Sequence, residues 1–406
     1  MNRKHVILAA VLLIALISVS LFFTVNMLSK QTSTTTRTTN RQFYVGVEFA
    51  YADQFGELKA LVDKVKDYTN LFVIGSVGIS FNRTALDESA DYINQSGLSF
   101  IVLFTSYPMY NNTGGWSNNY SIFDWMKDAQ QKYGNKFLGI YRFDEPGGNQ
   151  LDGGQFQLID KTNTAGGYAE VAQSYVGNLS SILKYYRDKG GSPQIFTSDY
   201  GLYWFDYASS YNTVFAEFVG KQSRFVGNQS KQQIIALDRG AAESFNKDWG
   251  IIVTWKYNQP PYLESGDELY SDLAQAYCTG AKYAVVFSYP NITASAYGTL
   301  TDAHFAALQK FWYDIHNNTA AFVPSKAEVA YVIPKDFGFG FRSTSDTIWG
   351  LFPADNFTYT QKIWDDINLL LAKYYNNLNI IYDDPQVIGS TLNQYTKVYY
   401  WNQTIT

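Results

Sequence analysis

An acidic pair, Asp144 and Glu145, is the feature of this chain that most clearly carries chemistry. It follows an apolar segment of strand length, Phe137–Phe143, and it precedes Pro146-Gly147-Gly148. Proline and glycine end a strand, so both carboxylates are expected at its C-terminal end rather than inside a sheet. Catalytic residues of parallel α/β proteins gather at that end. Two acids that cap a helix or form a turn would fit the same segment, so the surrounding elements must decide.

Those elements predict a parallel α/β protein. Short apolar runs, continuous rather than alternating, are typical of strands buried on both faces. They are Phe43–Phe49, Leu71–Gly75, Phe100–Phe104, Phe137–Phe143, Gln194–Ser198, Thr213–Phe218, Ile251–Trp255 and Tyr283–Ser288. Amphipathic helical stretches separate most of them: Phe55–Tyr68, Leu86–Gln95, Ile122–Tyr133, Tyr168–Arg187, Lys231–Phe245 and Glu268–Thr279. Eight strands with helical crossovers predict a (β/α)8 TIM barrel, which we assign to residues 43–322 as the catalytic domain.

A second pattern begins after residue 326. Strands are expected at Val329–Ile333, Leu378–Tyr382 and Lys397–Trp401, with an amphipathic helix over Tyr359–Tyr375. Residues 327–406 are therefore predicted to form a small three-stranded α/β domain at the C-terminus.

The N-terminus predicts a membrane anchor. Arg3 and Lys4 precede Val6–Leu28, an almost unbroken apolar stretch, and a bilayer core takes about 20 such residues. Positive charge ahead of the span keeps that end in the cytoplasm. Residues 1–28 are expected to be an uncleaved signal anchor and 29–42 a disordered Ser/Thr-rich tether. The chain would then be a single-pass cell-membrane protein with its C-terminal part outside the cell.

An extracellular location would give meaning to the Asn-x-Ser/Thr motifs, which are N-glycosylation acceptors in exported proteins. They occur at Asn82, Asn94, Asn111, Asn119, Asn178, Asn228, Asn291, Asn317, Asn356 and Asn402. Their spread along the chain fits a glycoprotein, although some arise by chance in a sequence rich in these residues.

The composition argues against several classes of site. A single cysteine, Cys278, excludes an intrachain disulfide and a cysteine-based zinc site, and three histidines are too few for a histidine-rich metal centre. No metal or cofactor is expected. A net charge of −5 without a basic cluster argues against nucleic acid as a partner.

In a barrel, the residues just past each strand converge on one cup. The acids among them are Glu48, Asp144, Glu145, Asp199 and Glu217, and Tyr107, Trp255, Lys256 and Tyr289 join them. Acids beside aromatic rings suit a carbohydrate, because glycoside hydrolysis needs one protonated and one ionised carboxyl. Crowding of acids raises the pKa of one of them, which prepares that division.

A fourth barrel strand that ends in an acidic pair followed by proline resembles the (β/α)8 glycoside hydrolases. In those enzymes an Asn-Glu-Pro at this place carries the acid/base glutamate, so the resemblance implies that Glu145 is the general acid/base. This chain has Asp144 where those enzymes have asparagine. An adjacent Asp-Glu also resembles the hexosaminidase type, in which the aspartate orients an acetamido group. The resemblance covers the barrel and is at the level of the fold.

The second carboxylate departs from that resemblance, which places it at the seventh strand. Here that strand ends in Trp255-Lys256-Tyr257, and no acid follows until Glu264. Glu217, at the end of the sixth strand, is the preferred partner of Glu145, and a surface glutamate at a strand end is the competing interpretation. Asp199 is a lesser candidate.

The remaining cup residues are predicted to bind substrate: Asp144, Glu48, Asp199, Tyr107, Trp255, Lys256 and Tyr289. Trp255 and Tyr289 could serve as stacking platforms or as core residues. Lys256 could bind an acidic sugar or neutralise the acids.

The sequence thus favours a membrane-anchored extracellular glycoside hydrolase that cleaves an oligosaccharide, polysaccharide or glycoconjugate by carboxylate acid/base catalysis, without a metal. The alternative is a catalytically inactive barrel that binds carbohydrate or serves as a structural cell-surface protein.

Overall fold

A computed structural model describes residues 42–104, 120–153, 157–160, 166–219, 230–254, 262–289, 295–354 and 359–405. Phe43–Thr406 form one compact unit. The predicted anchor (residues 1–28) and nearly all of the predicted tether lie outside the described residues. Within the described part of the chain, no helix combines the length and apolar character needed to cross a membrane.

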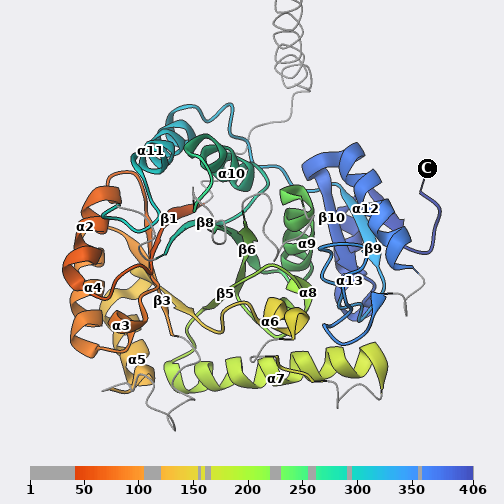
Figure 1. Cartoon of the computed structure of the whole chain (residues 1–406), viewed down its shortest axis with the longest axis horizontal. Coiled ribbons are helices and arrows are strands. Elements are labelled where there is room, and N and C mark those ends of the chain that lie inside the picture. The colour runs from red at the N-terminus through yellow and green to blue at the C-terminus, as the bar shows by residue number, and fades with distance from the viewer. Residues whose placement is uncertain are drawn as a thin grey trace, which may run out of the picture. The chain divides into compact units, whose positions relative to one another are not determined.

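The predicted barrel is confirmed, because eight parallel strands close on themselves in chain order (Figure 1). The strands are β1 (Tyr44–Phe49), β2 (Leu71–Ile74), β3 (Ser99–Leu103), β4 (Phe137–Tyr141), β5 (Ile195–Asp199), β6 (Thr213–Phe218), β7 (Asp248–Val253) and β8 (Tyr283–Ser288). Each overlaps a predicted apolar run, although β7 begins three residues before its predicted run, Ile251–Trp255. The last strand pairs with the first in continuous register from Tyr44 opposite Tyr283 to Phe49 opposite Ser288.

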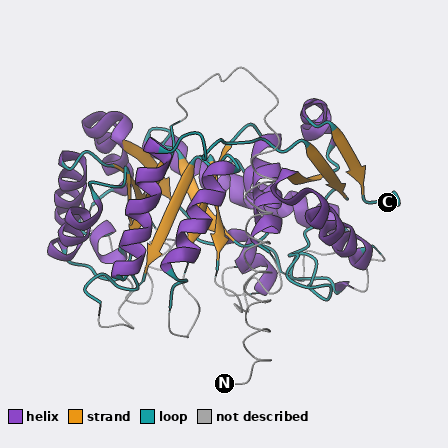
Figure 2. Ribbon diagram, turned by 90° about the horizontal axis from the view of Figure 1, so that it is seen from above, coloured by secondary structure: helices purple, strands orange, loops and turns teal. Residues whose placement is uncertain are grey.

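Helices surround the strands on the outside (Figures 1 and 2). They are α2 (Phe55–Val65), α3 (Val77–Ser80), α4 (Arg83–Gln95), α5 (Ile122–Tyr133), α6 (Pro146–Asp152), α7 (Gly167–Gly190), α8 (Tyr203–Ala208), α9 (Lys231–Ser244), α10 (Gly266–Cys278) and α11 (Asp302–Asn317). The predicted amphipathic stretches are all present. The sequence did not predict α8, because five of its six residues are buried and it therefore shows no polar face.

Alternate residues of each strand point into the barrel, as the two-residue period of a strand requires. Their side chains fill its interior with Tyr44, Leu71, Val73, Ile101, Tyr141, Phe196, Phe215, Ile252, Tyr283 and Val285. The interior is thus a packed core, and a cavity can open only above it, at the C-terminal ends of the strands.

The strand that carries the acidic pair is irregular. Phe100 of β3 pairs with Phe137 of β4, but Ile101 pairs with Gly139, so β4 holds one extra residue. At Gly139, where φ is 145°, a Cβ atom would lie 2.2 Å from the carbonyl oxygen of Gln194. Bulges of this kind re-aim the side chains that follow them, and here the acidic pair follows.

The predicted C-terminal sheet is present, with the strand order β10 (Leu378–Tyr382), β9 (Val329–Ile333), β11 (Lys397–Tyr400) and all strands parallel. Helices α12 (Thr360–Tyr374) and α13 (Pro385–Thr391) belong to this part of the chain. The separation of barrel and sheet into two domains stays a prediction, because the two make extensive contact.

Helix α9 joins the sheet to the barrel. The buried guanidinium of Arg239 donates to Asn379 Oδ1 at 2.7 Å and to the carbonyl oxygens of Asn376 at 2.7 Å and Leu378 at 2.9 Å. The next residue, Gly240, allows close approach, since a Cβ atom there would lie 2.4 Å from the carbonyl oxygen of Ile380. Arg239 and Gly240 of α9 therefore hold the C-terminal sheet against the barrel, and they lie outside the predicted cup.

Candidate active site

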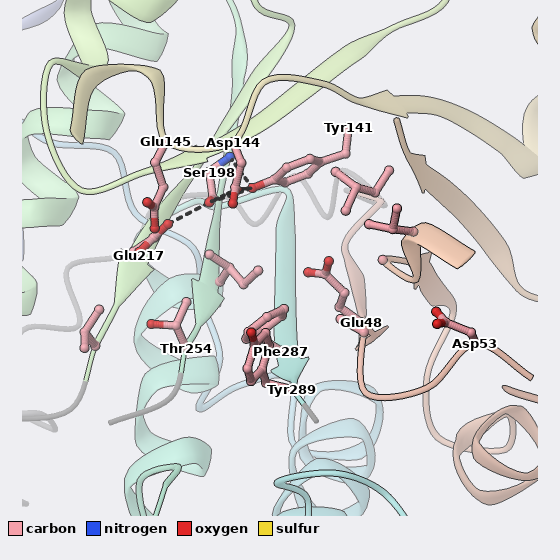
Figure 3. A pocket seen from close by; sticks show the side chains of 16 residues that line it. Glu48, Asp53, Tyr141, Asp144, Glu145, Ser198, Glu217, Thr254, Phe287 and Tyr289 are labelled. Atoms are coloured by element: carbon pink, nitrogen blue, oxygen red, sulfur yellow. Dashed lines mark hydrogen bonds between the residues drawn. The ribbon is translucent and has the colours of Figure 1, made fainter. Parts of the chain in front are cut away.

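A cavity of about 590 Å³ lies at the C-terminal ends of the barrel strands (Figure 3). The residues that line it come from most of the barrel strands and the turns that follow them. They are Glu48, Ala50, Asp53, Gly75, Val77, Leu103, Tyr141, Asp144, Glu145, Ser198, Glu217, Val219, Ile252, Thr254, Phe287 and Tyr289. The cavity therefore collects four of the five predicted acids: Glu48, Asp144, Glu145 and Glu217.

The turn that carries the acidic pair has an unusual backbone. Phe143 and Glu145 both adopt positive φ angles, 62° and 49°, which cost energy for residues other than glycine. The neighbouring strand β5 holds the turn in this shape: Thr197 Oγ1 donates to the Phe143 carbonyl at 2.6 Å, and the Glu145 N–H donates to the Ser198 carbonyl at 3.1 Å. The position of the Glu145 side chain is thus set by β5.

Asp199 supports the same turn from behind. It is fully buried, and its carboxylate accepts backbone N–H bonds from Gly147 at 2.5 Å, Gly148 at 2.9 Å, Tyr200 at 2.7 Å and Gly201 at 3.1 Å. Gly148 must be glycine, since a Cβ atom would lie 2.2 Å from the Tyr200 ring. Asp199 is absent from the cavity lining, so the structure places this predicted substrate-binding residue where it can position Glu145 instead.

The pKa of Asp199 lies at about 7. Burial raises it, and hydrogen bonds from the backbone N–H groups of Gly147, Gly201 and Tyr200 and from the Asp206 side chain partly offset that effect because they stabilise the ionised form.

Tyr141 and Ser198 connect the acids of the cavity (Figure 3). The Tyr141 hydroxyl donates to Asp144 Oδ1 and lies 2.7 Å from Ser198 Oγ. Ser198 Oγ donates to Glu217 Oε1 at 2.7 Å. The network thus links the ends of β4, β5 and β6 through two hydroxyl groups, and it fixes the Glu217 carboxylate relative to the acidic pair.

Glu145 and Glu217 form the central pair, and their carboxyl groups lie side by side (Figure 3). A hydrogen bond between the two carboxyls raises the pKa of Glu145 and lowers that of Glu217. Burial raises the pKa of Glu145, and Glu217 and Asp144 raise it further. Burial and Asp144 also raise the pKa of Glu217, but the hydrogen bonds from Ser198 and Glu145 oppose that rise. Of the two, Glu145 is therefore the group that keeps a proton.

Asp144 is buried in the same cluster. Burial raises the pKa of its carboxyl, while the hydrogen bonds from Tyr141 and Ser198 lower it. Its carboxyl is thus held mainly by the Tyr141 hydroxyl, and Ser198 Oγ, which donates to Glu217, lies 3.4 Å from Asp144 Oδ1.

The opposite side of the cavity is built by β1 and β8. Glu48 of β1 is 4% exposed, and the register places it beside Phe287 of β8. Burial, then Asp144 and Glu217, raise the pKa of Glu48 to about 8. Tyr289 is 38% exposed and its ring lies 5.6 Å from that of Phe287, so the predicted stacking residue stands at the cavity mouth.

Three predicted substrate-binding residues, Tyr107, Trp255 and Lys256, lie outside the described residues. The last described residue after β7 is Thr254, which lines the cavity at the strand where the resemblance expects a carboxylate.

Sequence reasoning missed Tyr141, Ser198, Thr254 and Asp53 as lining residues. Strand alternation could have found three of them. Tyr141 is a polar residue on the inward face of β4. Ser198 follows inward Phe196 by two positions, and Thr254 follows inward Ile252 by two. Among the described residues, no group of three or more His, Cys, Asp or Glu side chains is arranged to hold a metal ion.

The amino-acid sequence matches no family model and no curated protein. The fold matches solved structures of glycoside hydrolases. A GH5_18 protein from Streptomyces cattleya, solved with Manβ1-4GlcNAc, aligns with a TM-score of 0.56 at 12% identity, covering 89% of this chain and 99% of that one. A GH42 β-galactosidase from G. stearothermophilus also gives 0.56, at 11% identity, covering 89% of this chain and 68% of that one.

A β-galactosidase from the Antarctic haloarchaeon Halorubrum lacusprofundi gives a TM-score of 0.52 at 12% identity, with coverage of 88% and 69%. At these identities the likeness concerns the fold. The chain thus shares the eight-stranded barrel fold of these glycoside hydrolases, as the strand pattern predicted, without assignment to one family.

Proposed function

We propose that this protein is a glycoside hydrolase in which Glu145 and Glu217 perform the chemistry. The observation that carries the proposal is the contact between two buried carboxyls (Figure 3), which shifts their pKa values in opposite directions. Glycosidic bond cleavage needs such a division between a protonated acid and an ionised base or nucleophile.

In the proposed reaction, Glu145 donates its proton to the glycosidic oxygen as the bond from that oxygen to the anomeric carbon breaks. Glu217 attacks the anomeric carbon, and water then releases the sugar while Glu145 takes a proton from that water. Retaining enzymes hold their carboxyls about 5–5.5 Å apart and inverting enzymes about 6.5–9.5 Å. The contact of the pair is nearer to the shorter of these separations, which supports the retaining reaction, and the two side chains must move apart to admit the substrate.

The surrounding residues suit these roles. Ser198 donates to Glu217, which stabilises its ionised form and orients it. Asp144 is a hydrogen-bond acceptor next to the pair, where it can hold a sugar hydroxyl or amide. Phe287 and Tyr289 offer ring faces to the apolar side of a sugar.

A binding or structural role for the barrel is the second candidate. One observation favours it: Thr254 lines the cavity at the end of β7, where the resemblance to glycoside hydrolases expects a carboxylate.

A glycan panel separates the two candidates. The full chain, Glu145→Gln and Glu217→Gln are each incubated with β-linked oligosaccharides, and reducing ends and bound ligand are both measured. We expect turnover by the unmodified protein, and loss of turnover with retained binding in both variants. Glu88→Gln, an equal change at an exposed position of α4, is the matched control. Binding without turnover by all four proteins would support the second candidate.

We also propose that residues 1–28 anchor the protein in the cell membrane and that residues 43–322 and 327–406 act outside the cell as a barrel and a smaller domain. The exposure of Asn178, Asn317 and Asn402 in their glycosylation motifs supports this. Protease treatment of intact cells expressing the full chain would digest an extracellular part. Protection of that part until lysis would contradict the proposal.

A further inference from the structure

Glu48 is a buried carboxyl that the proposed reaction does not use. Its side chain points into the cavity (Figure 3), and its residue is 4% exposed. In the described part of the chain it has no hydrogen-bond or ion-pair partner, whereas Asp144 and Glu217 each accept hydrogen bonds from hydroxyl groups. Its carboxyl faces the cavity rather than the packed interior, so a ligand in the cavity can supply the hydrogen bonds that no described protein group provides.

The charge of the cavity indicates which kind of ligand. Glu48, Asp144, Glu145 and Glu217 all line it, and no lysine, arginine or histidine is among its described lining residues. Burial and the neighbouring carboxyls favour the protonated form of Glu48. A ligand cation beside Glu48 would reverse that balance, because an opposite charge favours ionisation. A sugar hydroxyl carries no charge, so it would leave the negative charge of the ionised acids without a counter-charge.

The chemical surroundings of Glu48 fit an amine on a sugar ring. Its neighbour in register on β8 is Phe287, which contacts Tyr289 at a ring distance of 5.6 Å. This pair offers ring faces for the apolar side of a sugar, and Glu48 offers a carboxylate for its substituent. A divalent cation fits less well, because no set of three or more acidic, histidine or cysteine ligands is assembled within the described ranges.

We propose that Glu48, with Phe287 and Tyr289, forms a subsite for the protonated amino group of a hexosamine, so that the preferred substrate is an oligosaccharide with free amines. Calling the ligand a substrate rests on the proposed hydrolase function, but the preference for binding an amine does not require turnover. Binding converts Glu48 from the protonated to the ionised form, and the proton goes to the buffer.

The test compares three β1-4-linked trisaccharides: a glucosamine trisaccharide, its N-acetylated form and cellotriose. Binding is measured by calorimetry with the full chain carrying Glu145→Gln, which blocks turnover. We expect the amine ligand to bind at least about tenfold more tightly than cellotriose, which is about 1.4 kcal/mol. Adding Glu48→Gln should abolish that preference. Equal affinities without the Glu48 substitution, or a preference that survives it, would overturn the proposal.

Asp53→Asn is the matched control, since it removes one charge from the same cavity. Asp53 already accepts hydrogen bonds from Ser76 Oγ at 2.7 Å and the Gly78 N–H at 3.2 Å, so the amine preference should survive its substitution. Loss of the preference in Asp53→Asn as well would show general attraction of cations and reject a Glu48 subsite.

Proton release tests the proposal without any change at Glu48. Below neutral pH, where the ligand amine and Glu48 both hold their protons before binding, calorimetry of the amine ligand in two buffers of different ionisation enthalpy should show release of a proton, and cellotriose should show none. No release would contradict the proposed ionisation. The outcome is also separable from the proposed function: glycan turnover without amine preference rejects the subsite alone, and amine preference without any turnover rejects hydrolysis alone.

Discussion

The acids on the two sides of the cavity differ in their hydrogen-bond partners. On the β4–β6 wall, formed by Tyr141, Asp144, Glu145, Ser198 and Glu217, hydrogen bonds join the carboxyls to one another or to hydroxyl groups. On the β1–β8 wall, formed by Glu48, Phe287 and Tyr289, the one carboxyl lies beside aromatic rings. A preorganised network suits a reaction, because its groups need no rearrangement as charge develops. A carboxyl without a hydrogen-bond partner in the described part of the protein, such as Glu48, is instead available to bind a ligand.

The largest effect is expected from a change on the β4–β6 wall. Glu145→Gln removes the proton donor but keeps the shape of the side chain. If Glu145 is the general acid, kcat should fall roughly 10²- to 10⁴-fold, the usual contribution of such a group. Glu48→Gln on the opposite wall should act mainly through KM for an amine substrate. Steady-state kinetics of both variants measure these effects. A larger loss of kcat in Glu48→Gln than in Glu145→Gln would mean that the β1–β8 wall, and not the β4–β6 wall, carries the reaction.

A smaller effect is expected at Ser198. Ser198→Ala removes the 2.7 Å hydrogen bond to Glu217 Oε1, which lowers the pKa of that carboxyl. A hydrogen bond to a charged group contributes about 1.5–3 kcal/mol, so kcat/KM should fall roughly 10- to 150-fold.

The same variant has a pH signature. Glu217 must be ionised and Glu145 protonated, so activity rises with pH through the pKa of Glu217 and falls through that of Glu145. Without Ser198 Oγ the rising limb should move to higher pH. Ser80→Ala, at another buried serine, is the control. A fall in activity without any shift of the limb would assign Ser198 a purely structural role.

The free energy of unfolding should depend on pH through Glu48, the carboxyl of the β1–β8 wall. The pKa of Glu48 is about 8 in the folded chain against 4.5 ordinarily, so the folded state holds a proton that the unfolded state has lost. The free-energy cost of burying this carboxyl is thus smallest below about pH 4.5, and it grows as pH rises toward 8, so the folded state loses stability over this range. Between these values, Glu48→Gln should lose less stability than the unmodified protein. Thermal melts across this range measure the difference, and parallel curves would contradict it.

The fold could be predicted because its signal is local. Each barrel strand is a continuous apolar run, and parallel strands buried on both faces require that composition. Helix α8 was not predicted, since its buried aromatic residues carry no helical polar face, and α3, α6 and α13 were missed because helices of four to seven residues are too short to show a periodic pattern.

The site was predictable in part. Glu48, Glu145 and Glu217 were found as acids at strand ends, and they do line one cavity. Asp199 was grouped with them, yet it follows Ser198, and successive residues of a strand point to opposite faces. Ser198 therefore lines the cavity and Asp199 lies behind it. The positive φ angles of Phe143 and Glu145 could not be foreseen, because they depend on hydrogen bonds from β5, which is remote in sequence.

The smallest effect is expected at the mouth of the β1–β8 wall. Tyr289→Ala removes a ring that is 38% exposed and contacts Phe287, so a sugar would lose one stacking surface. An aromatic contact of this kind contributes about 0.5–1.5 kcal/mol, which corresponds to an increase in KM of roughly 2- to 10-fold with little change in kcat. Tyr313→Ala, at a 61% exposed tyrosine of α11, controls for the loss of surface area. A drop in kcat that matches the rise in KM would mean that the ring acts on the reacting bond, and the division between a reacting and a recognising wall would then fail.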